Sequence, residues 1–189
     1  MSNTDEIDYG PLNNLIGEWQ GDEGLDIAPE PDGEENNPYF ETITYVPADD
    51  VTNAEIQTLS IVHYRQVVRR KSNGKVFHDQ TGYWLWDAAN KTVMHSFVIP
   101  RAVCVLAGGI YTGKQDAQGR AVLELSAKVS DPKWGIIQSP FMQDNALTTA
   151  FWQEVAVGNG RLSYAQTTMV DIYGKTFEHT DRNELKLAP

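Results

Sequence analysis

The sequence predicts an all-β fold, a single antiparallel up-and-down β-barrel of about ten strands with a short N-terminal helix. Two observations support this prediction. Short runs rich in Val, Ile, Thr, Tyr, Phe and Trp follow one another along the chain, and clusters of Gly, Asn, Asp and Pro separate them, which is the pattern of strands joined by turns. No long amphipathic helix lies between these runs, so we expect each strand to pair with its sequence neighbour.

Each apolar run is expected to form one strand. Tight turns join the runs, because sequences such as Ser72-Asn73-Gly74-Lys75 and Gly158-Asn159-Gly160 tolerate the left-handed backbone of a hairpin. Residues near 9–16 are expected to form the helix, which would plug one end of the barrel. The expected strands span residues 17–25, 39–46, 56–70, 76–87, 92–99, 103–112, 120–129, 147–157, 161–171 and 175–187.

Two stretches lack the strand pattern. Residues 26–38 are acidic, rich in Pro and without apolar alternation, and residues 130–146 contain Asp131-Pro132 and Ser139-Pro140. Loops of this length in a compact barrel are often lids or binding loops. We therefore expect two long loops within one barrel domain, residues 1–189, that begins with a flexible N-terminus at 1–9.

The composition narrows the choice of partners. The chain has 15 Lys and Arg against 26 Asp and Glu, a net charge of −11, which repels nucleic acid and anionic membrane surfaces. No apolar run approaches the roughly 20 residues of a membrane helix, no secretory signal opens the sequence, and the lone Cys104 suits a reducing compartment. We expect a cytoplasmic monomer or dimer with no nucleic-acid or membrane partner.

Common catalytic and metal-binding motifs are absent from the sequence. There is no HExxH, CxxC, P-loop or GxSxG pattern, and four scattered histidines with one cysteine make a poor structural zinc site. Hydrolase and nucleotide chemistry are therefore not supported.

Several short motifs resemble those of one family. The segment Leu15-Ile16-Gly17-Glu18-Trp19-Gln20-Gly21 contains the Gly-x-Trp typical of calycins. It is similar to the L-I-G-x-W-x-G opening of the nitrobindin-like, haem-binding β-barrel family, whose lipocalin-like fold resembles that of fatty-acid-binding proteins. Further motifs of that family match in order along most of the chain. They are Tyr64-Arg65-Gln66, the segment Val76–Trp84, Leu162-Ser163-Tyr164 followed by Met169, and Phe177-Glu178-His179-Thr180 followed by Leu185.

The resemblance implies a ferric haem b in the barrel mouth, with His179 as the axial ligand of the iron. It places His78 on the distal side or near a propionate, and the open coordination position would bind NO or isomerise peroxynitrite. From the residues alone, the favoured explanation of His179 is a strand histidine that is hydrogen-bonded or faces solvent, and only the family position makes the haem ligand an equal alternative. The favoured explanation of His78 is a hairpin residue bonded to Asp79 or Gln80.

The resemblance also implies structural roles at the closed end of the barrel. Trp19 would plug this end, Gly17 would permit the close approach of the first strand, and Arg182 would pack across Trp19.

A further set of residues is expected to line the ligand cavity. Trp84 and Trp86 share one face of their strand and Tyr83 and Leu85 share the other, so one of the two pairs lines the interior. An aromatic wall suits haem and lipid alike. His95 has the strand parity of Val93 and Phe97, so we expect it to be packed in the interior. The cavity candidates are Tyr64, Gln66, Trp84, His95 and Met169.

One segment departs from the family pattern. The family's G-x-G-x-Y-P-T, which contributes a threonine beside the haem, is replaced by residues 22–29 and an acidic insertion, so this branch could have kept the barrel and changed the ligand. Three functions therefore stay open. They are haem binding, with peroxynitrite isomerisation as its chemistry, carriage or sensing of a fatty acid or similar apolar ligand without iron, and an interaction module with a filled barrel.

Overall fold

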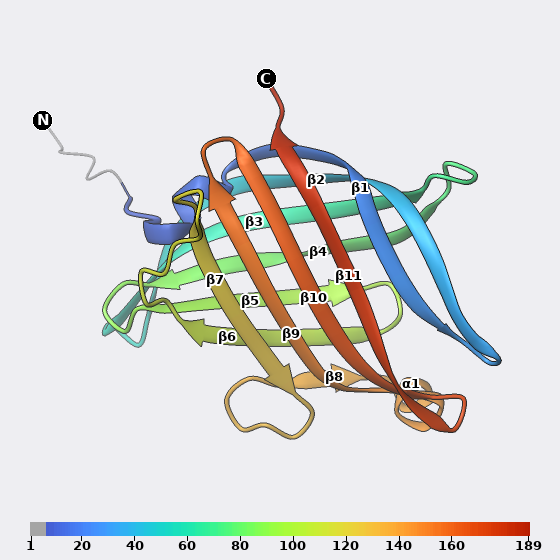
Figure 1. Cartoon of the computed structure of the whole chain (residues 1–189). Helices are drawn as coiled ribbons and strands as arrows, with labels where there is room; N and C mark the ends of the chain where they lie inside the picture. The colour runs from blue at the N-terminus through green and yellow to red at the C-terminus, as the bar shows by residue number, and fades with distance from the viewer. Residues whose placement is uncertain (1–6) are drawn as a thin grey trace, which may run out of the picture.

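A closed antiparallel barrel of ten strands, with one extra strand beside it, forms the protein (Figure 1). The computed structural model describes residues 7–189. Around the wall the order is β1-β2-β3-β4-β5-β6-β7-β9-β10-β11, and β11 returns to pair with β1. This confirms the fold class. The elements are η1 (Gly10–Leu15), β1 (Gly17–Glu30), β2 (Gly33–Asn53), β3 (Gln57–Arg70), β4 (Val76–Asp87), β5 (Thr92–Ile99), β6 (Val103–Ile110), β7 (Ala121–Lys128), β8 (Ile136–Gln138), α1 (Pro140–Asn145), β9 (Ala146–Gly158), β10 (Arg161–Ile172) and β11 (Lys175–Leu187).

The up-and-down order gives the barrel two different ends. Because successive strands reverse direction, alternate connections meet at the same end. The 3-10 helix η1 and the β9–β10 hairpin lie at the closed end. The open end carries the β1–β2, β3–β4, β5–β6 and β10–β11 turns together with β8 and α1 (Figure 1).

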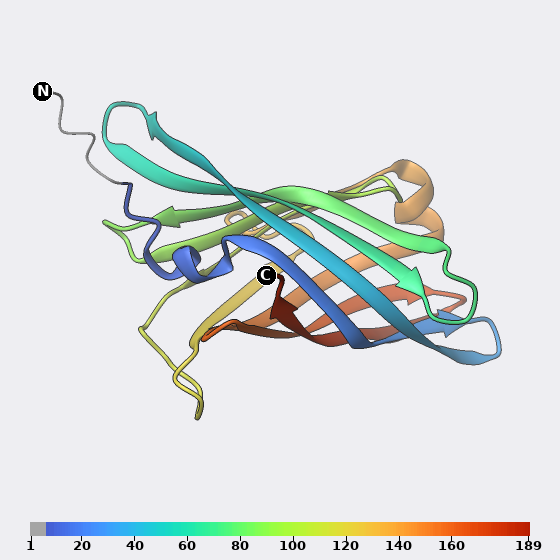
Figure 2. The same ribbon diagram turned by 90° about the horizontal axis from the view of Figure 1, so that it is seen from above.

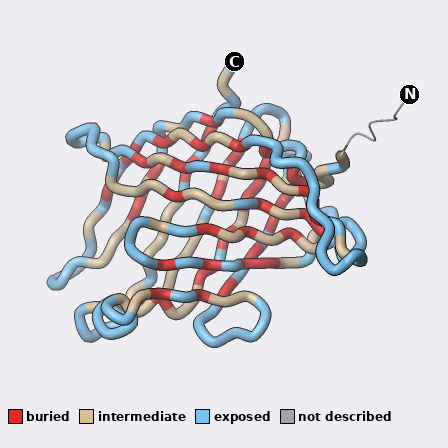
Figure 3. The backbone as a smooth tube through the Cα atoms, turned by 180° about the vertical axis from the view of Figure 1, so that it is seen from behind, coloured by how far each residue is buried: buried red, intermediate tan, exposed pale blue. Residues whose placement is uncertain are grey.

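The inner face follows the two-residue period of the strands. In β3, for example, Val62, Tyr64, Gln66 and Val68 are buried while the residues between them are half-buried or exposed, because successive strand side chains point to opposite faces. Figure 3 shows this alternation along most of the wall.

Large apolar side chains fill the closed end. Trp19 is 1% exposed, and its indole Nε1 donates a 2.7 Å hydrogen bond to the carbonyl of Leu15 at the end of η1. Gly17, with a φ of 132°, allows the strand to begin here, since a Cβ at this position would lie 2.6 Å from Cδ1 of Leu187.

The expected packing of Arg182 across Trp19 is not formed. Trp19 pairs with Leu187, whereas Arg182 pairs with Leu25, further along β1. In β11 the buried residues are Asn183 and Leu185, so Arg182 has the opposite parity and its side chain is exposed. The prediction was therefore wrong about both register and face.

The stretch 26–38 is a hairpin of paired strands and not the expected loop. β1 continues to Glu30 and β2 begins at Gly33, with Ala28 opposite Glu35. Beyond Asp26 and Asn37 this ribbon has no buried residue, because it projects past the barrel at the open end (Figure 2). Hydrogen bonds between the two backbones hold this ribbon together, although it has no apolar core on which alternate side chains could pack.

The stretch 130–146 is a connection that contains the short β8 and α1. β8 pairs with the first residues of β6, beside the point where β6 and β7 share a single bridge between Gly108 and Ser126. Ser139 caps α1 by accepting a 3.3 Å hydrogen bond from the backbone N–H of Met142. Among residues 7–189, no helix has the length and apolarity needed to cross a membrane.

Candidate functional site

Polar side chains occupy the middle of the barrel, between the apolar closed end and the open end. They come from inward-facing positions on β2, β3, β4, β5, β9 and β11, and all of them are less than 9% exposed. They are Glu41, Gln66, Gln80, His95, Gln153 and Asn183. Buried polar groups need hydrogen-bond partners, and these groups find them mainly in one another and in buried tyrosines.

His95 lies at the centre of this set and is 1% exposed. Its ring stacks on Trp84, with ring centroids 4.2 Å apart and 18° between the planes. Its Nε2 lies 2.7 Å from the Tyr64 hydroxyl and its Nδ1 lies 3.1 Å from Oε1 of Gln153. Burial lowers the pKa of His95 to about 3, so the ring is neutral near pH 7.

The hydrogen bonds around His95 have a fixed direction. Gln80 Nε2 donates to the Tyr64 hydroxyl at 2.5 Å, so the Tyr64 proton is directed at His95 Nε2. His95 then carries its proton on Nδ1 and donates it to Gln153. Gln153 Nε2 in turn donates to Oε1 of Gln166 at 3.3 Å.

Glu41 is a carboxyl group buried without an opposite charge in contact. Its oxygens contact Gln66 Nε2, the Tyr164 hydroxyl at 3.0 and 3.1 Å, and Asn183 Nδ2 at 2.7 Å. Burial raises the pKa of Glu41 to about 7, although the three hydrogen bonds oppose this rise. Such a perturbed group inside a binding fold is a recognised sign of a functional site.

A small cavity lies against this polar wall. Its volume is about 10 Å³, close to the least that holds one water molecule. Trp84 lines the cavity, and its indole Nε1 is a buried donor with no hydrogen-bond partner among residues 7–189. The lining residues are Ile43, Tyr45, Tyr64, Gln66, Gln80, Trp84, His95, Gln153, Val155, Leu162 and Tyr164.

The predicted cavity residues are therefore placed in two groups. Tyr64, Gln66, Trp84 and His95 all line this cavity. Met169 does not, because it lies half-buried in β10 near the open end, where it pairs with Ala150 of β9.

The two histidines singled out by the family resemblance lie at the open end. His179 of β11 places its Nε2 2.5 Å from Oδ1 of Asp26, and 34% of its side chain is exposed. His78 of β4 places its Nε2 3.2 Å from Oε1 of Gln80. Burial lowers the pKa of His78, and the charge of Arg101 acts in the same direction.

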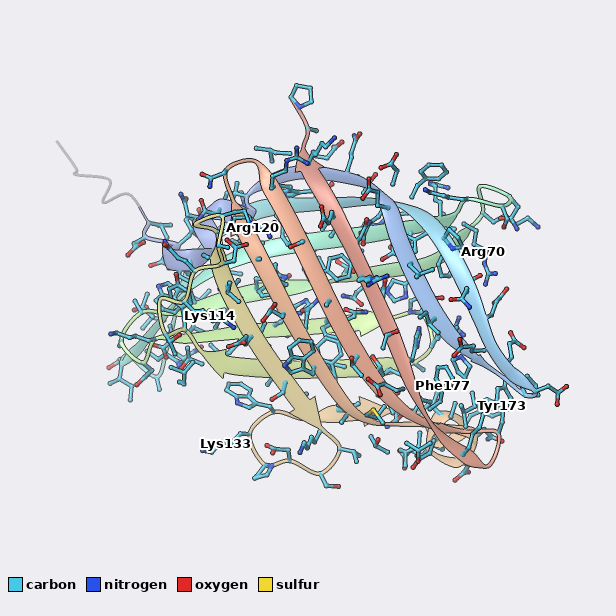
Figure 4. All side chains as sticks on the ribbon, in the orientation of Figure 1. Arg70, Lys114, Arg120, Lys133, Tyr173 and Phe177 are labelled. Carbon is cyan, nitrogen blue, oxygen red and sulfur yellow. The ribbon has the colours of Figure 1, made fainter. Side chains whose placement is uncertain are left out.

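The open end does not fit the haem that the resemblance implies. The His179 nitrogen that would bind iron is bonded to Asp26. Immediately inside it, Asp181 and Tyr39 are hydrogen-bonded to each other, where a porphyrin needs an apolar slot several hundred Å³ in volume. Neither the interior cavity nor the surface groove of about 330 Å³ at the closed end includes His179 or His78. Figure 4 shows the two ends, with Phe177 near the open end and Arg120 near the closed end.

Sequence reasoning missed most of the polar interior. Apart from Tyr64 and Gln66, it did not select the carboxyl, amide and tyrosine side chains that bond across the barrel. One signal was available, because Tyr39, Glu41, Ile43 and Tyr45 share one parity in β2, which places a glutamate on an otherwise apolar inner face. The missed residues are Asp26, Tyr39, Glu41, Gln80, Gln153, Tyr164, Asp181 and Asn183.

Comparisons with known proteins agree with this architecture. A family model described as a THAP4-like, heme-binding beta-barrel domain matches residues 8–186. The crystal structure of Rv2717c from M. tuberculosis is similar with a TM-score of 0.67 and 19% sequence identity, over 96% of this chain and 100% of that one. At this identity the likeness concerns the fold. No curated protein matches the sequence. Because the family model covers nearly the whole barrel, the chain belongs to the THAP4-like, heme-binding beta-barrel domain family, a family of small-ligand-binding barrels.

Proposed function

We propose that this barrel binds a small, neutral, polar molecule in its interior. The observation that carries the proposal is the buried, unpartnered Nε1–H of Trp84, a residue that lines a cavity together with hydrogen-bonded tyrosine, glutamine and histidine side chains. Leaving a buried donor unpaired costs about 1–3 kcal/mol. A ligand with an acceptor oxygen would recover that free energy.

The chemistry of the wall supports a neutral ligand. An anion would be repelled by Glu41, which has no basic group among its contacts. A cation would gain little from Glu41, because both carboxylate oxygens already accept hydrogen bonds. A long apolar ligand would separate the polar groups of the wall without replacing their hydrogen bonds, which is unfavourable in a buried site. We therefore do not propose a fatty-acid carrier.

The size of the cavity limits the ligand. Only a molecule of about the size of water fits the present space of about 10 Å³. A somewhat larger ligand would require the amides of Gln66 and Gln80 to change rotamer. His78 is hydrogen-bonded to Gln80. A ligand that enters from the open end and moves the Gln80 amide would therefore change the hydrogen bonding of His78.

Haem is not proposed as the ligand of this chain. The family description names it, but Asp26 is bonded to the Nε2 of His179. The polar side chains of Asp181 and Tyr39 are hydrogen-bonded to each other where a porphyrin would need apolar contacts. NO binding and peroxynitrite isomerisation would both need the iron, so neither is proposed.

The proposal is tested by following the indole N–H signals of the protein by NMR during titration with formamide, a small neutral amide. We expect the Trp84 Nε1–H signal to move in a saturable manner. The signal of Trp152, whose side chain is on the outer face and 42% exposed, should stay in place. Substitution Trp84→Phe should abolish binding, and the matched Trp152→Phe should retain it.

Two other outcomes would overturn the proposal. Movement of the Trp84 signal by decanoate but not by formamide would indicate an apolar-ligand carrier. Saturation by neither probe, with Trp84 unchanged up to high millimolar formamide, would indicate a filled barrel.

A further inference from the structure

Four side chains form a continuous row of oxygens across the barrel. Asp181 of β11 contacts the Tyr39 hydroxyl of β2, which lies 2.7 Å from the Tyr164 hydroxyl of β10. The Tyr164 hydroxyl contacts both oxygens of Glu41, at 3.0 and 3.1 Å. The row therefore begins and ends with a carboxyl group, and two hydroxyl groups lie between them.

The row needs more protons than its two tyrosines supply. Each of its three links, Asp181 to Tyr39, Tyr39 to Tyr164 and Tyr164 to Glu41, joins two oxygens and requires one hydrogen. The two hydroxyls provide two hydrogens, so the third comes from a carboxyl group. The Tyr39 hydroxyl also lies 3.2 Å from the carbonyl of Arg182, and a hydrogen donated there would raise the number needed from the carboxyls.

The surroundings show which carboxyl is ionised. Glu41 faces two amide donors, Gln66 Nε2 and Asn183 Nδ2. The orientation of the Asn183 amide is fixed, because its Oδ1 accepts a 2.8 Å hydrogen bond from the backbone N–H of Glu184. Donors on both carboxyl oxygens favour the charged form of Glu41.

Asp181 has the opposite environment. One side-chain amide reaches it, Gln166 Nε2, at 3.4 Å from Oδ2, and the backbone N–H of Arg182 also donates to this carboxyl group. In the proposed state Oδ1 carries the proton and donates it to Tyr39. Asp26 stands directly opposite Asp181 in the β1–β11 ladder, and two charged carboxylates in facing positions repel each other. Burial, first, and then the charge of Glu41 raise the pKa of Asp181 well above its ordinary value.

We propose that the barrel contains a binding site for one proton, held on Asp181 and shared with Glu41 through the hydroxyls of Tyr39 and Tyr164. Transfer along the row moves the Asp181 proton to Tyr39, the Tyr39 proton to Tyr164 and the Tyr164 proton to Glu41. The net step converts neutral Asp181 and ionised Glu41 into ionised Asp181 and neutral Glu41. No atom or electron is gained or lost. The negative charge moves from the polar interior to a position beside the open end.

Other titratable groups surround the row. Asp26 of β1 acts on Asp181 and is itself paired with His179 of β11. On the inner side Tyr45 of β2 lies close enough for the charge of Glu41 to raise its pKa. No Lys or Arg side chain is hydrogen-bonded to any of the four members within residues 7–189, so no fixed positive charge decides where the proton lies.

The direct test is a pH titration of the wild-type protein followed through the ¹³C carboxyl signals of Asp181 and Glu41. We expect Asp181 to show the signal of a neutral carboxyl at pH 8 while Glu41 shows that of a carboxylate. On acidification Glu41 should bind a proton near pH 7, and the row of four side chains then carries one proton more than it does at pH 8. Ionised signals from both residues at pH 8 would contradict the shared proton, and so would a neutral Glu41 beside an ionised Asp181.

Two isosteric substitutions give an independent readout of stability. Asp181→Asn retains a donor toward Tyr39 and an acceptor for Gln166, so its Tm should stay within about 3 °C of the wild type. Glu41→Gln turns an amide group toward the fixed amide of Asn183, so its Tm should fall by about 4–12 °C. Equal losses, or the reverse order, would overturn the assignment of the proton to Asp181.

The role of the Tyr39 hydroxyl is tested with Tyr39→Phe, which removes this hydroxyl from the row. The matched control is Tyr45→Phe, because the Tyr45 hydroxyl takes no part in the row. In Tyr39→Phe, Glu41 should titrate without any change in the Asp181 signal. In Tyr45→Phe the two carboxyls should still respond to each other. Coupling that persists unchanged in Tyr39→Phe would show that the proton does not travel through this hydroxyl.

Discussion

At the scale of single residues, the barrel depends on side chains that are buried for two different reasons. Trp19 is buried because its indole is large and apolar, and its one polar atom is satisfied by Leu15. His95 is buried although it is polar, because both ring nitrogens have partners within the interior. Substitutions of these two residues are therefore expected to have different effects on stability.

Replacing Trp19 with Ala should lower the free energy of unfolding by about 3–5 kcal/mol, the usual range for deleting a large buried aromatic side chain. The indole is 1% exposed and belongs to the main apolar core. Denaturant unfolding would measure the loss. Trp152→Ala, on the outer face, is the control, and an equally small effect of both substitutions would contradict the placement of Trp19 as the plug.

Replacing His95 with Asn should change the pH dependence of stability. Burial lowers the pKa of His95 from 6.5 to about 3, so the unfolded state binds this proton first when the pH falls. The stability that neutral His95 contributes is present above pH 6.5 and is lost as the pH falls toward 3. The stability difference between wild type and His95→Asn should therefore shrink by up to about 1.4 kcal/mol per pH unit in that window.

The measurement is denaturant unfolding of both proteins between pH 8 and pH 4. The shared carboxyl groups contribute to both profiles and cancel in the difference. Parallel profiles would show that His95 is either already protonated or free to exchange with solvent.

The sequence allowed the prediction of which residues face inward, but not of how they bond. Strand parity predicted that His95 faces the interior and that Trp84 shares a face with Trp86, because the side-chain period of a strand is fixed. The family resemblance selected Tyr64 and Gln66. The hydrogen bond between Tyr39 and Tyr164 joins two residues that are 125 positions apart along the chain. It depends on register and rotamers, which local patterns do not determine.

At the scale of the elements, the main error of prediction lies in a hairpin whose strands pair through their backbones without packing on the apolar core. The β1–β2 hairpin lacks apolar alternation because it projects beyond the barrel, and its backbone pairing is invisible to hydrophobic patterns. Arg182 was misplaced because β11 pairs with β1 in a register that puts Leu187 opposite Trp19 and Arg182 opposite Leu25, and local sequence patterns do not determine this register. The bounds of the other strands agree with the prediction to within a few residues, except that β2 continues to Asn53 and that β8 lies in a predicted loop.

Close contact between neighbouring strands gives a prediction at this scale. A Cβ on Gly82 of β4 would lie 2.0 Å from the carbonyl oxygen of Ser96 in β5, whereas a Cβ on Gly33 of β2 would meet nothing within 4 Å. Gly82→Ala should therefore destabilise the protein by about 1–3 kcal/mol, since backbone atoms must move to make room. Gly33→Ala should change stability by less than about 0.5 kcal/mol.

Unfolding midpoints of the two glycine variants, measured side by side, check this prediction. If Gly82→Ala is as stable as Gly33→Ala, then β4 and β5 do not approach each other as closely as the structure shows.

At the scale of the whole molecule, the protein combines the barrel of its family with a polar interior. The apolar closed end, the polar middle and the open end with Asp26 and His179 form three successive layers along the axis. The middle layer is satisfied almost entirely by its own members, which explains why so little space is left for a ligand. The acidic β1–β2 hairpin supplies Asp26, the residue that is paired with His179.

Absorption spectroscopy of the protein titrated with haemin tests the central claim most directly, namely that the interior is a polar site and not a haem site. The wild type should give only the spectrum of free or loosely adsorbed haemin, and His179→Ala should give the same spectrum. A sharp Soret band that forms at one haemin per chain and disappears in His179→Ala would contradict the account.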